Sequence, residues 1–176
     1  MKLVDRIVVL HEHLERASIP HAFGGALALA WCTERARATI DIDLNVFVEP
    51  DAIGATLDSF PNGLAVTEEN RVALDADGQT RLWWDATPVD LFCSTTPFHD
   101  DVAKRVRVEN FGGAQVPFLA CRDLAVFKAF FDRTKDRADL EEMASADTLD
   151  VEAVLGVLVR YLGGGDQRVE RLRGLG

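Results

Sequence analysis

The chain has 176 residues, of which 48% are hydrophobic and 27% charged, as expected of a globular protein with a sizeable core. Its formal net charge of −10 argues against broad non-specific nucleic-acid binding, which depends on many Lys and Arg contacts to phosphate. No apolar run approaches the roughly 18 residues that span a bilayer, so we expect no membrane partner.

Apolar periodicity predicts the first elements. Helical spacing over residues 3–17, interrupted by acids, predicts an amphipathic helix and not a signal peptide. A short strand then ends at Gly24-Gly25, and a helix of small residues follows directly. Unbroken period-two alternation predicts a strand over residues 39–48, and a helix is expected at about 51–60.

The remaining elements alternate between hairpins and helices. In chain order we expect a hairpin turning at Asp77-Gly78, a strand in "TPVDLF", a helix over 97–104, a hairpin in "RVRVENFGGAQVPFL", and three helices from residue 121 before "GGG". The fold class is therefore α+β, a mixed sheet flanked by helices. We expect a single domain over residues 1–176, with a core at about 18–119 and a helical C-terminal portion at about 120–176.

The three cysteines are scattered and form no CxxC spacing. An odd, scattered set is typical of buried thiols in a reducing compartment, so a cytoplasmic location is expected. The histidines offer no zinc pair, since "HEH" at 11–13 places its two on different helix faces and His21 and His99 have no obvious metal partner in the sequence.

Gly24 and Gly25 lie between a strand and a helix. Glycine lets the backbone approach a ligand closely, and free N–H groups at a helix start attract anions, so the pair suits a phosphate. The alternative is an ordinary turn between a strand and a helix.

Asp41 and Asp43 share one face of the strand at 39–48. Like charges that close together repel, and a divalent cation such as Mg²⁺ or Mn²⁺ removes the conflict. The alternative is a solvated edge face that opposes aggregation. Asp90 interrupts the apolar strand "TPVDLF" and would bring a third carboxylate to the same face if the two strands pair; otherwise it is a strand-end acid.

Lys128 falls within the apolar stripe of its predicted helix, so it either snorkels to solvent or faces a polar cavity that holds an anion such as a triphosphate. In "DRTKDRADL", Lys135 with Asp139 and Arg137 with Glu141 are spaced i, i+4. By itself this spacing predicts exposed ion pairs on a solvated helix.

Taken together, "FGGALAL", "RATIDIDL", "VDLF", the helical lysine and "RTKDRADL" resemble the DNA-polymerase-β-like nucleotidyltransferase superfamily. The likeness runs from about residue 18 to residue 142. Within the superfamily, the chain is most similar to the minimal toxins of abortive-infection (type IV) toxin–antitoxin pairs. It departs from the superfamily's usual Gly-Ser at Gly24-Gly25, which removes a phosphate-binding hydroxyl.

The resemblance implies a nucleotidyltransferase-like sheet and a set of site residues. Asp41, Asp43 and Asp90 would bind the metal ions and, with Lys128, form the catalytic group. The implied nucleotide-binding residues are Gly24, Gly25, Arg37, Thr39, Lys135 and Asp139. In this scheme Lys128 neutralises the triphosphate, and Lys135 and Asp139 line or brace the site.

The resulting hypothesis is an Mg²⁺- or Mn²⁺-dependent enzyme that transfers NMP from an NTP to an acceptor hydroxyl. The expected acceptor is a tRNA 3′ end, and the expected protein partner is a cognate antitoxin. The alternatives are an antibiotic- or protein-modifying nucleotidyltransferase, and a non-catalytic antitoxin or binding module that keeps the fold.

Overall fold

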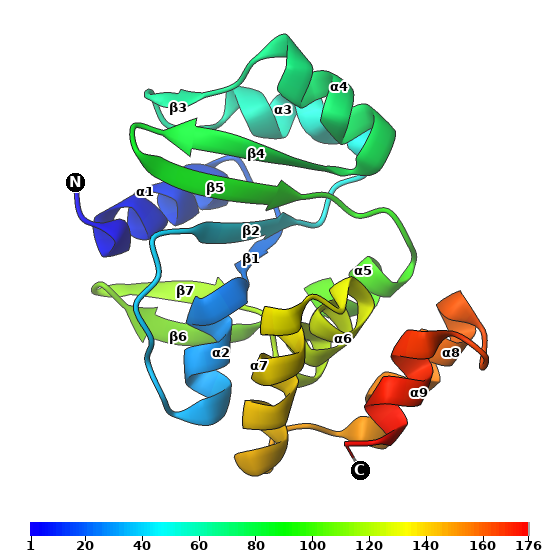
Figure 1. Ribbon diagram of the computed structural model, residues 1–176. Helices are drawn as coiled ribbons and strands as arrows, with labels where there is room; N and C mark the ends of the chain where they lie inside the picture. The colour runs from blue at the N-terminus through cyan, green and yellow to red at the C-terminus, as the bar shows by residue number, and fades with distance from the viewer. Residues whose placement is uncertain (176) are drawn as a thin grey trace. The chain divides into compact units, whose positions relative to one another are not determined.

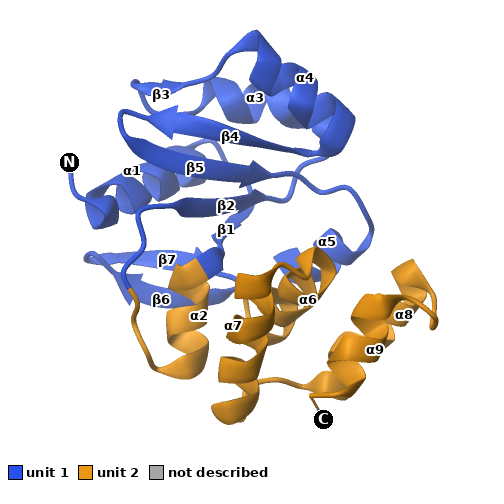
Figure 2. Cartoon of the chain, viewed as in Figure 1, with its two compact units in different colours: residues 1–25, 38–119 blue, residues 26–37, 120–176 orange. Residues whose placement is uncertain are grey.

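The computed structural model describes residues 1–175, which divide into two compact units (Figures 1 and 2). Unit 1 comprises residues 1–25 and 38–119 and contains the β-sheet. Unit 2 comprises residues 26–37 and the described residues from Ala120 onward, and it is helical. The single-domain organisation over 1–176 stays a prediction.

Unit 1 holds the strands and, apart from α2, the helices that precede residue 120. The helices are α1 (Leu3–Arg16), the 3₁₀ turn η1 (Pro50–Ala52), α3 (Ile53–Asp58), α4 (Glu68–Asp77) and α5 (Phe98–Ala103). The strands are β1 (His21–Phe23), β2 (Ile42–Val46), β3 (Leu64–Ala65), β4 (Gln79–Trp84), β5 (Thr87–Phe92), β6 (Arg107–Phe111) and β7 (Ala114–Phe118).

Among the described residues, seven strands form one mixed sheet in the order β3-β4-β5-β2-β1-β7-β6 (Figure 1). The pairs β2–β5 and β1–β7 are parallel, and the other neighbours are antiparallel. The predicted α+β class with a mixed sheet is confirmed. The predicted hairpin near residues 105–119 is also confirmed as β6–β7, which turns at Gly112-Gly113.

The central strands form the core because their apolar side chains alternate with the acids. Ile42, Leu44 and Leu91 are fully buried, whereas Asp43 and Asp90 are half-buried. This alternation turns the acids of β2 and β5 onto the face opposite those aliphatic side chains.

One predicted element in unit 1 is wrong, and another is shorter than predicted. Asp77-Gly78 is not a hairpin turn: Asp77 ends α4, and Gly78 caps the helix in the left-handed conformation (φ +67°). Thr67 starts α4 by accepting a hydrogen bond from the N–H of Asn70, and this cap favours the helix. The strand predicted at 39–48 is shorter and spans only Ile42–Val46. Its predicted N-terminal end does not pack against the core, since Ile40 is 73% exposed.

Unit 2 is built from α2 (Gly25–Thr33, after its first residue), α6 (Cys121–Phe131), α7 (Thr134–Ser145), α8 (Val151–Leu162) and α9 (Gln167–Arg173). Helix α6 packs against α7, α8 and α9. The helical C-terminal portion is therefore confirmed. None of the helices within residues 1–175 has the length and apolar content needed to cross a membrane.

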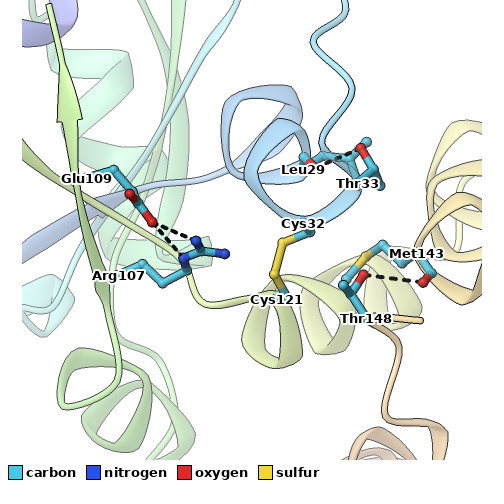
Figure 3. The surroundings of a disulfide bond; sticks show 8 residues. All are labelled: Leu29, Cys32, Thr33, Arg107, Glu109, Cys121, Met143 and Thr148. Carbon is cyan, nitrogen blue, oxygen red and sulfur yellow. Dashed lines mark hydrogen bonds and ion pairs between the residues drawn. A yellow bond between two sulfur atoms is a disulfide. The ribbon is translucent and has the colours of Figure 1, made fainter. Parts of the chain in front are cut away.

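A disulfide joins Cys32 of α2 to Cys121 of α6, with their Cα atoms 5.6 Å apart (Figure 3). The expectation of three thiols is therefore wrong for this pair, whose 89-residue separation gave no local signal. Cys93 is a free, buried thiol, and burial raises its pKa to about 11. Because disulfides are rare in reducing compartments, the cytoplasmic location stays a prediction.

Candidate active site

The strongest feature of unit 1 is the pairing of two acids on neighbouring strands. In the parallel register of β2 and β5, Asp43 lies directly opposite Asp90. Directly paired residues project to the same face, so the two carboxylates face the same side of the sheet. The expectation that these strands pair, made from "IDIDL" and "TPVDLF", is confirmed.

Asp41 precedes β2 and is held by a local turn. Its backbone N–H donates to the Thr39 hydroxyl oxygen at 3.2 Å, and the Thr39 Oγ1 lies 3.3 Å from the Asp41 carbonyl oxygen. Thr39 therefore acts on the backbone of Asp41, through the N–H and the carbonyl of that residue. The nucleotide-binding role predicted for Thr39 stays a prediction.

The Gly24-Gly25 turn lies against Asp43. The Gly24 N–H donates to the Asp43 carbonyl at 2.8 Å, which extends the β1–β2 ladder by one residue. Gly25 has a positive φ of +56°, and a Cβ placed there would lie 1.8 Å from Asp43 Oδ2. The Asp43 carboxylate thus takes the space of a side chain at position 25. A serine at position 25 would displace the Asp43 carboxylate from its place in this structure.

Arg81 was missed in the sequence, and it contacts the acids directly. It lies opposite Asp90 in the β4–β5 register, and its guanidinium donates to both Asp90 oxygens, at 2.6 Å and 2.7 Å. Recognising that the chain turns at Asp85-Ala86, between β4 and β5, would have paired the two positions. The turn at Asp85-Ala86 was not recognised because the hairpin turn had been predicted at Asp77-Gly78.

The charge of Arg81 is fixed by the acids around it. Its hydrogen bonds to Asp90 are the main cause that raises its pKa, and the charges of Asp90, Asp41 and Asp43 raise it further. All three acids therefore act electrostatically on one guanidinium.

A second group of predicted residues lies in unit 2, around Lys128. The Lys128 side chain is buried, and its Nζ lies 2.6 Å from Asp139 Oδ2 and 3.8 Å from Asp136 Oδ1. Arg37 adds two hydrogen bonds to Asp139, at 2.6 Å and 3.1 Å. The Lys128 ammonium is therefore buried and forms ion pairs with two aspartates, and it does not extend to solvent.

The Asp139 carboxylate is held in its charged form. Burial raises its pKa, but the hydrogen bonds from Arg37 and Lys128 outweigh burial, so the pKa falls below its usual value. The expected i, i+4 pair between Asp139 and Lys135 is wrong, because Asp139 faces Lys128 and Arg37 instead. Lys135 is exposed on the same helix.

The other expected i, i+4 pair on α7 is also wrong. Arg137 lies 3.6 Å from Asp132 and donates to the Thr134 hydroxyl, so its guanidinium points away from Glu141. Helix α7 is therefore not the uniformly solvated helix that its charge spacing suggested: Asp136 and Asp139 form a buried face, while Lys135 and Glu141 are exposed.

The predicted residues accordingly fall into two groups. Gly24, Gly25, Thr39, Asp41, Asp43 and Asp90 belong to unit 1, and Arg37, Lys128, Lys135 and Asp139 belong to unit 2. The roles implied for them by resemblance stay predictions.

No family model matches the sequence, and no curated protein matches it. Solved structures do match. An antigenic nucleotidyltransferase-like protein from Paracoccidioides brasiliensis is 17% identical, with a TM-score of 0.57 over 96% of this chain and 92% of that one. A protein from H. pylori assigned as a nucleotidyltransferase is also 17% identical, with a TM-score of 0.51 over 97% of this chain and 79% of that one.

The chain has a nucleotidyltransferase-like fold. At these identities the likeness establishes the fold alone. The antibiotic-resistance factor ANT(2'')-Ia also matches, at 14% identity and a TM-score of 0.48 over 97% of this chain and 89% of that one.

Proposed function

We propose that this protein is a divalent-metal-dependent nucleotidyltransferase, which transfers NMP from an NTP to an acceptor hydroxyl. The observation that carries the proposal is the direct pairing of Asp43 with Asp90 on parallel strands, with the Gly24-Gly25 turn against Asp43. Two acids at adjacent positions in a sheet interior repel each other, and a cation-binding role accounts for their placement.

The donor set suits Mg²⁺ or Mn²⁺, because both prefer carboxylate oxygens. Arg81 already binds both oxygens of Asp90, but a carboxylate offers about four lone-pair sites. Asp90 can therefore keep Arg81 and still offer an oxygen to a cation with Asp41 and Asp43. When bound, the cation would neutralise charge on the triphosphate and on the departing pyrophosphate.

The chain's own residues would position the reactants. The N–H of Gly24 is already used by the Asp43 carbonyl, so the phosphate contacts would come from Gly25 and the residues directly after it. Asp90 would accept the proton of the acceptor hydroxyl as it attacks the α-phosphorus. Arg81 would hold the Asp90 carboxylate in one orientation during this step.

For unit 2, we propose that Lys128 neutralises the triphosphate. An ammonium has three protons, and the hydrogen bond to Asp139 uses one of them, so Lys128 could also donate to a phosphate oxygen. Asp139 would act by bracing Lys128, and Arg37 by bracing Asp139. Lys135, which is exposed, would contact the nucleotide at the rim of the site.

We further propose that the acceptor is a tRNA 3′ end and that the protein is the toxin of a toxin–antitoxin pair, acting in the cytoplasm. This proposal rests on the sequence resemblance. Modification of an antibiotic or of a protein is the enzymatic alternative. One observation supports the non-catalytic alternative: Arg81 binds both oxygens of Asp90. If this ion pair prevents a cation from binding to Asp90, the protein is a non-catalytic module.

The test is nucleotide transfer from each α-labelled NTP, with Mg²⁺ or Mn²⁺, to total tRNA, cell extract or aminoglycosides. We expect one labelled product, and Asp43→Asn or Asp90→Asn should lower the labelling at least about a hundredfold. Asp75→Asn is the matched control, since Asp75 is an exposed acid of the same unit, on α4. Its labelling should be unchanged.

Calorimetry with Mg·NTP separates the remaining outcomes. If no acceptor is labelled but Asp43→Asn weakens Mg·NTP binding, the protein is a nucleotide-binding module and not an enzyme. If no acceptor is labelled and the variant binds Mg·NTP as the wild type does, the proposed site is wrong.

A further inference from the structure

Three potential metal ligands meet in unit 1 at a place that the proposed function does not use. His11 and Glu15 lie one turn apart on α1, and His21 is the first residue of β1. One ligand atom from each residue lies within 4.8 Å of the other two. The sequence offers His21 no obvious metal partner, but in the structure the short connection after α1 brings it beside His11.

The hydrogen bonds fix how the two imidazoles face each other. His21 Nδ1 lies 2.8 Å from the Ile19 carbonyl oxygen, and a carbonyl only accepts, so Nδ1 carries the proton. The other nitrogen, Nε2, therefore presents a lone pair, and it points at His11 Nδ1 at 3.0 Å. A histidine whose second nitrogen is held by a backbone carbonyl is the usual arrangement of a metal ligand.

The surroundings favour ligand-competent side chains. His11 and His21 are buried, with only 9% and 4% of their surfaces exposed. Glu15 is exposed and contributes a carboxylate at the mouth of the pair. Two buried imidazoles beside one carboxylate form a mixed nitrogen and oxygen donor set.

We propose that His11, Glu15 and His21 bind one Zn²⁺ ion, with solvent as the fourth ligand. Ligands bonded at 2.0–2.1 Å in a tetrahedral site lie about 3.3 Å apart, close to the present separation of the two imidazole nitrogens. His11 moves its ring proton from Nδ1 to Nε2 on binding. The exposed Glu15 side chain swings inward to complete the set.

Such an ion would link the end of α1 to the start of β1. His21 is three residues before Gly24, so the ion would fix the N-terminal end of the strand that leads into the glycine turn. The proposal stands apart from the nucleotidyltransferase proposal, because none of its ligands belongs to the acidic group on β2 and β5.

The experiment titrates Zn²⁺ into the EDTA-treated full chain by calorimetry, and Co²⁺ by visible absorption. Both are done in the Asp43→Asn background, so that the strand acids contribute less to the signal. We expect one high-affinity Zn²⁺ per chain and a Co²⁺ spectrum typical of four-coordination. His11→Gln, His21→Gln and Glu15→Gln should each weaken Zn²⁺ binding at least about tenfold. His13→Gln, on the same helix but bonded to the Val9 carbonyl, is the matched control and should bind as before.

Glu15→Gln keeps the test decisive if a histidine variant fails to fold, since Glu15 is exposed and its change leaves the core intact. Zn²⁺ should also raise the melting temperature of the wild type, and EDTA should reverse the rise. Absence of stoichiometric Zn²⁺ binding, or equal binding by the wild type and Glu15→Gln, would overturn the proposal and leave the imidazoles as a hydrogen-bonded pair.

Discussion

Gly25→Ala tests the contact between the glycine turn and the acids. Gly25 has a φ of +56°, and an alanine in this left-handed region costs about 1–2 kcal/mol. The new Cβ would also lie 1.8 Å from Asp43 Oδ2 and 2.5 Å from its Cγ. Asp43 must therefore leave its rotamer, at a further cost of about 0.5–1.5 kcal/mol.

We therefore expect Gly25→Ala to lower the free energy of unfolding by about 2–3 kcal/mol. Urea unfolding followed by circular dichroism measures this as a lower midpoint at an unchanged slope. Gly54→Ala is the matched control: Gly54 lies in α3 of the same unit with nothing within 4 Å of an added Cβ, and alanine there should stabilise by about 0.5–1 kcal/mol.

A double-mutant cycle separates the two costs. In an Asp43→Ala background there is no carboxylate to displace, so Gly25→Ala should cost only the backbone term of about 1–2 kcal/mol. Mn²⁺ affinity should also fall in Gly25→Ala alone, because the displaced carboxylate is one of the proposed ligands. An equal cost in both backgrounds would refute the idea that Asp43 fills the space at position 25.

Three further predictions concern the other buried groups. Asp139→Asn should lower the free energy of unfolding by about 3 kcal/mol at pH 7, because it breaks a buried ion pair, whereas the exposed Glu141→Gln should change it by under about 0.5 kcal/mol. Since the folded Asp139 pKa is depressed, this contribution is complete above the unfolded pKa of about 3.9 and is lost as the pH falls through the lower folded pKa. A difference between wild type and variant that does not shrink once the pH is below about 3.9 would contradict it. Reduction of the Cys32–Cys121 disulfide should lower stability by up to about 4–5 kcal/mol for its 89-residue separation, measured as the urea midpoint with and without dithiothreitol; an unchanged midpoint would exclude a disulfide in the folded protein. Cys93, with its pKa raised to about 11, should react with iodoacetamide at pH 8 only after unfolding, and rapid labelling of the native protein would show that the thiol is accessible.

The strand pattern in the sequence predicted which residues lie on the polar face of each strand. Period-two alternation placed Asp43 on the polar face of its strand, and the interrupted apolar run of β5 marked Asp90 as an acid that would join it if the two strands paired, as they do. The strand register could not be derived from the sequence, because it depends on which strands pair. Arg81 was missed for this reason, since only the register of β4 and β5 places it opposite Asp90. A misplaced turn at Asp77-Gly78 hid the hairpin that would have shown it.

Contacts between distant helices could not be predicted for a different reason. The apolar stripe around Lys128 allows two fates for the ammonium, and only the packing of α6 on α7 brings it to Asp139. The disulfide and the His11–His21 pair are likewise products of tertiary packing. Helical and strand periodicities report which face is buried, but not which residue lies opposite.

The two-part construction of unit 2 has a consequence for biosynthesis. Residues 26–37 leave the ribosome long before the stretch from Ala120 onward with which they form one unit. At about 5–20 residues per second, the 89 residues between the two cysteines take roughly 5–20 seconds to translate. During that interval Cys32 has no native partner, because Cys121 has not yet been synthesised. In an oxidising environment, Cys32 of the nascent chain could therefore form a non-native disulfide.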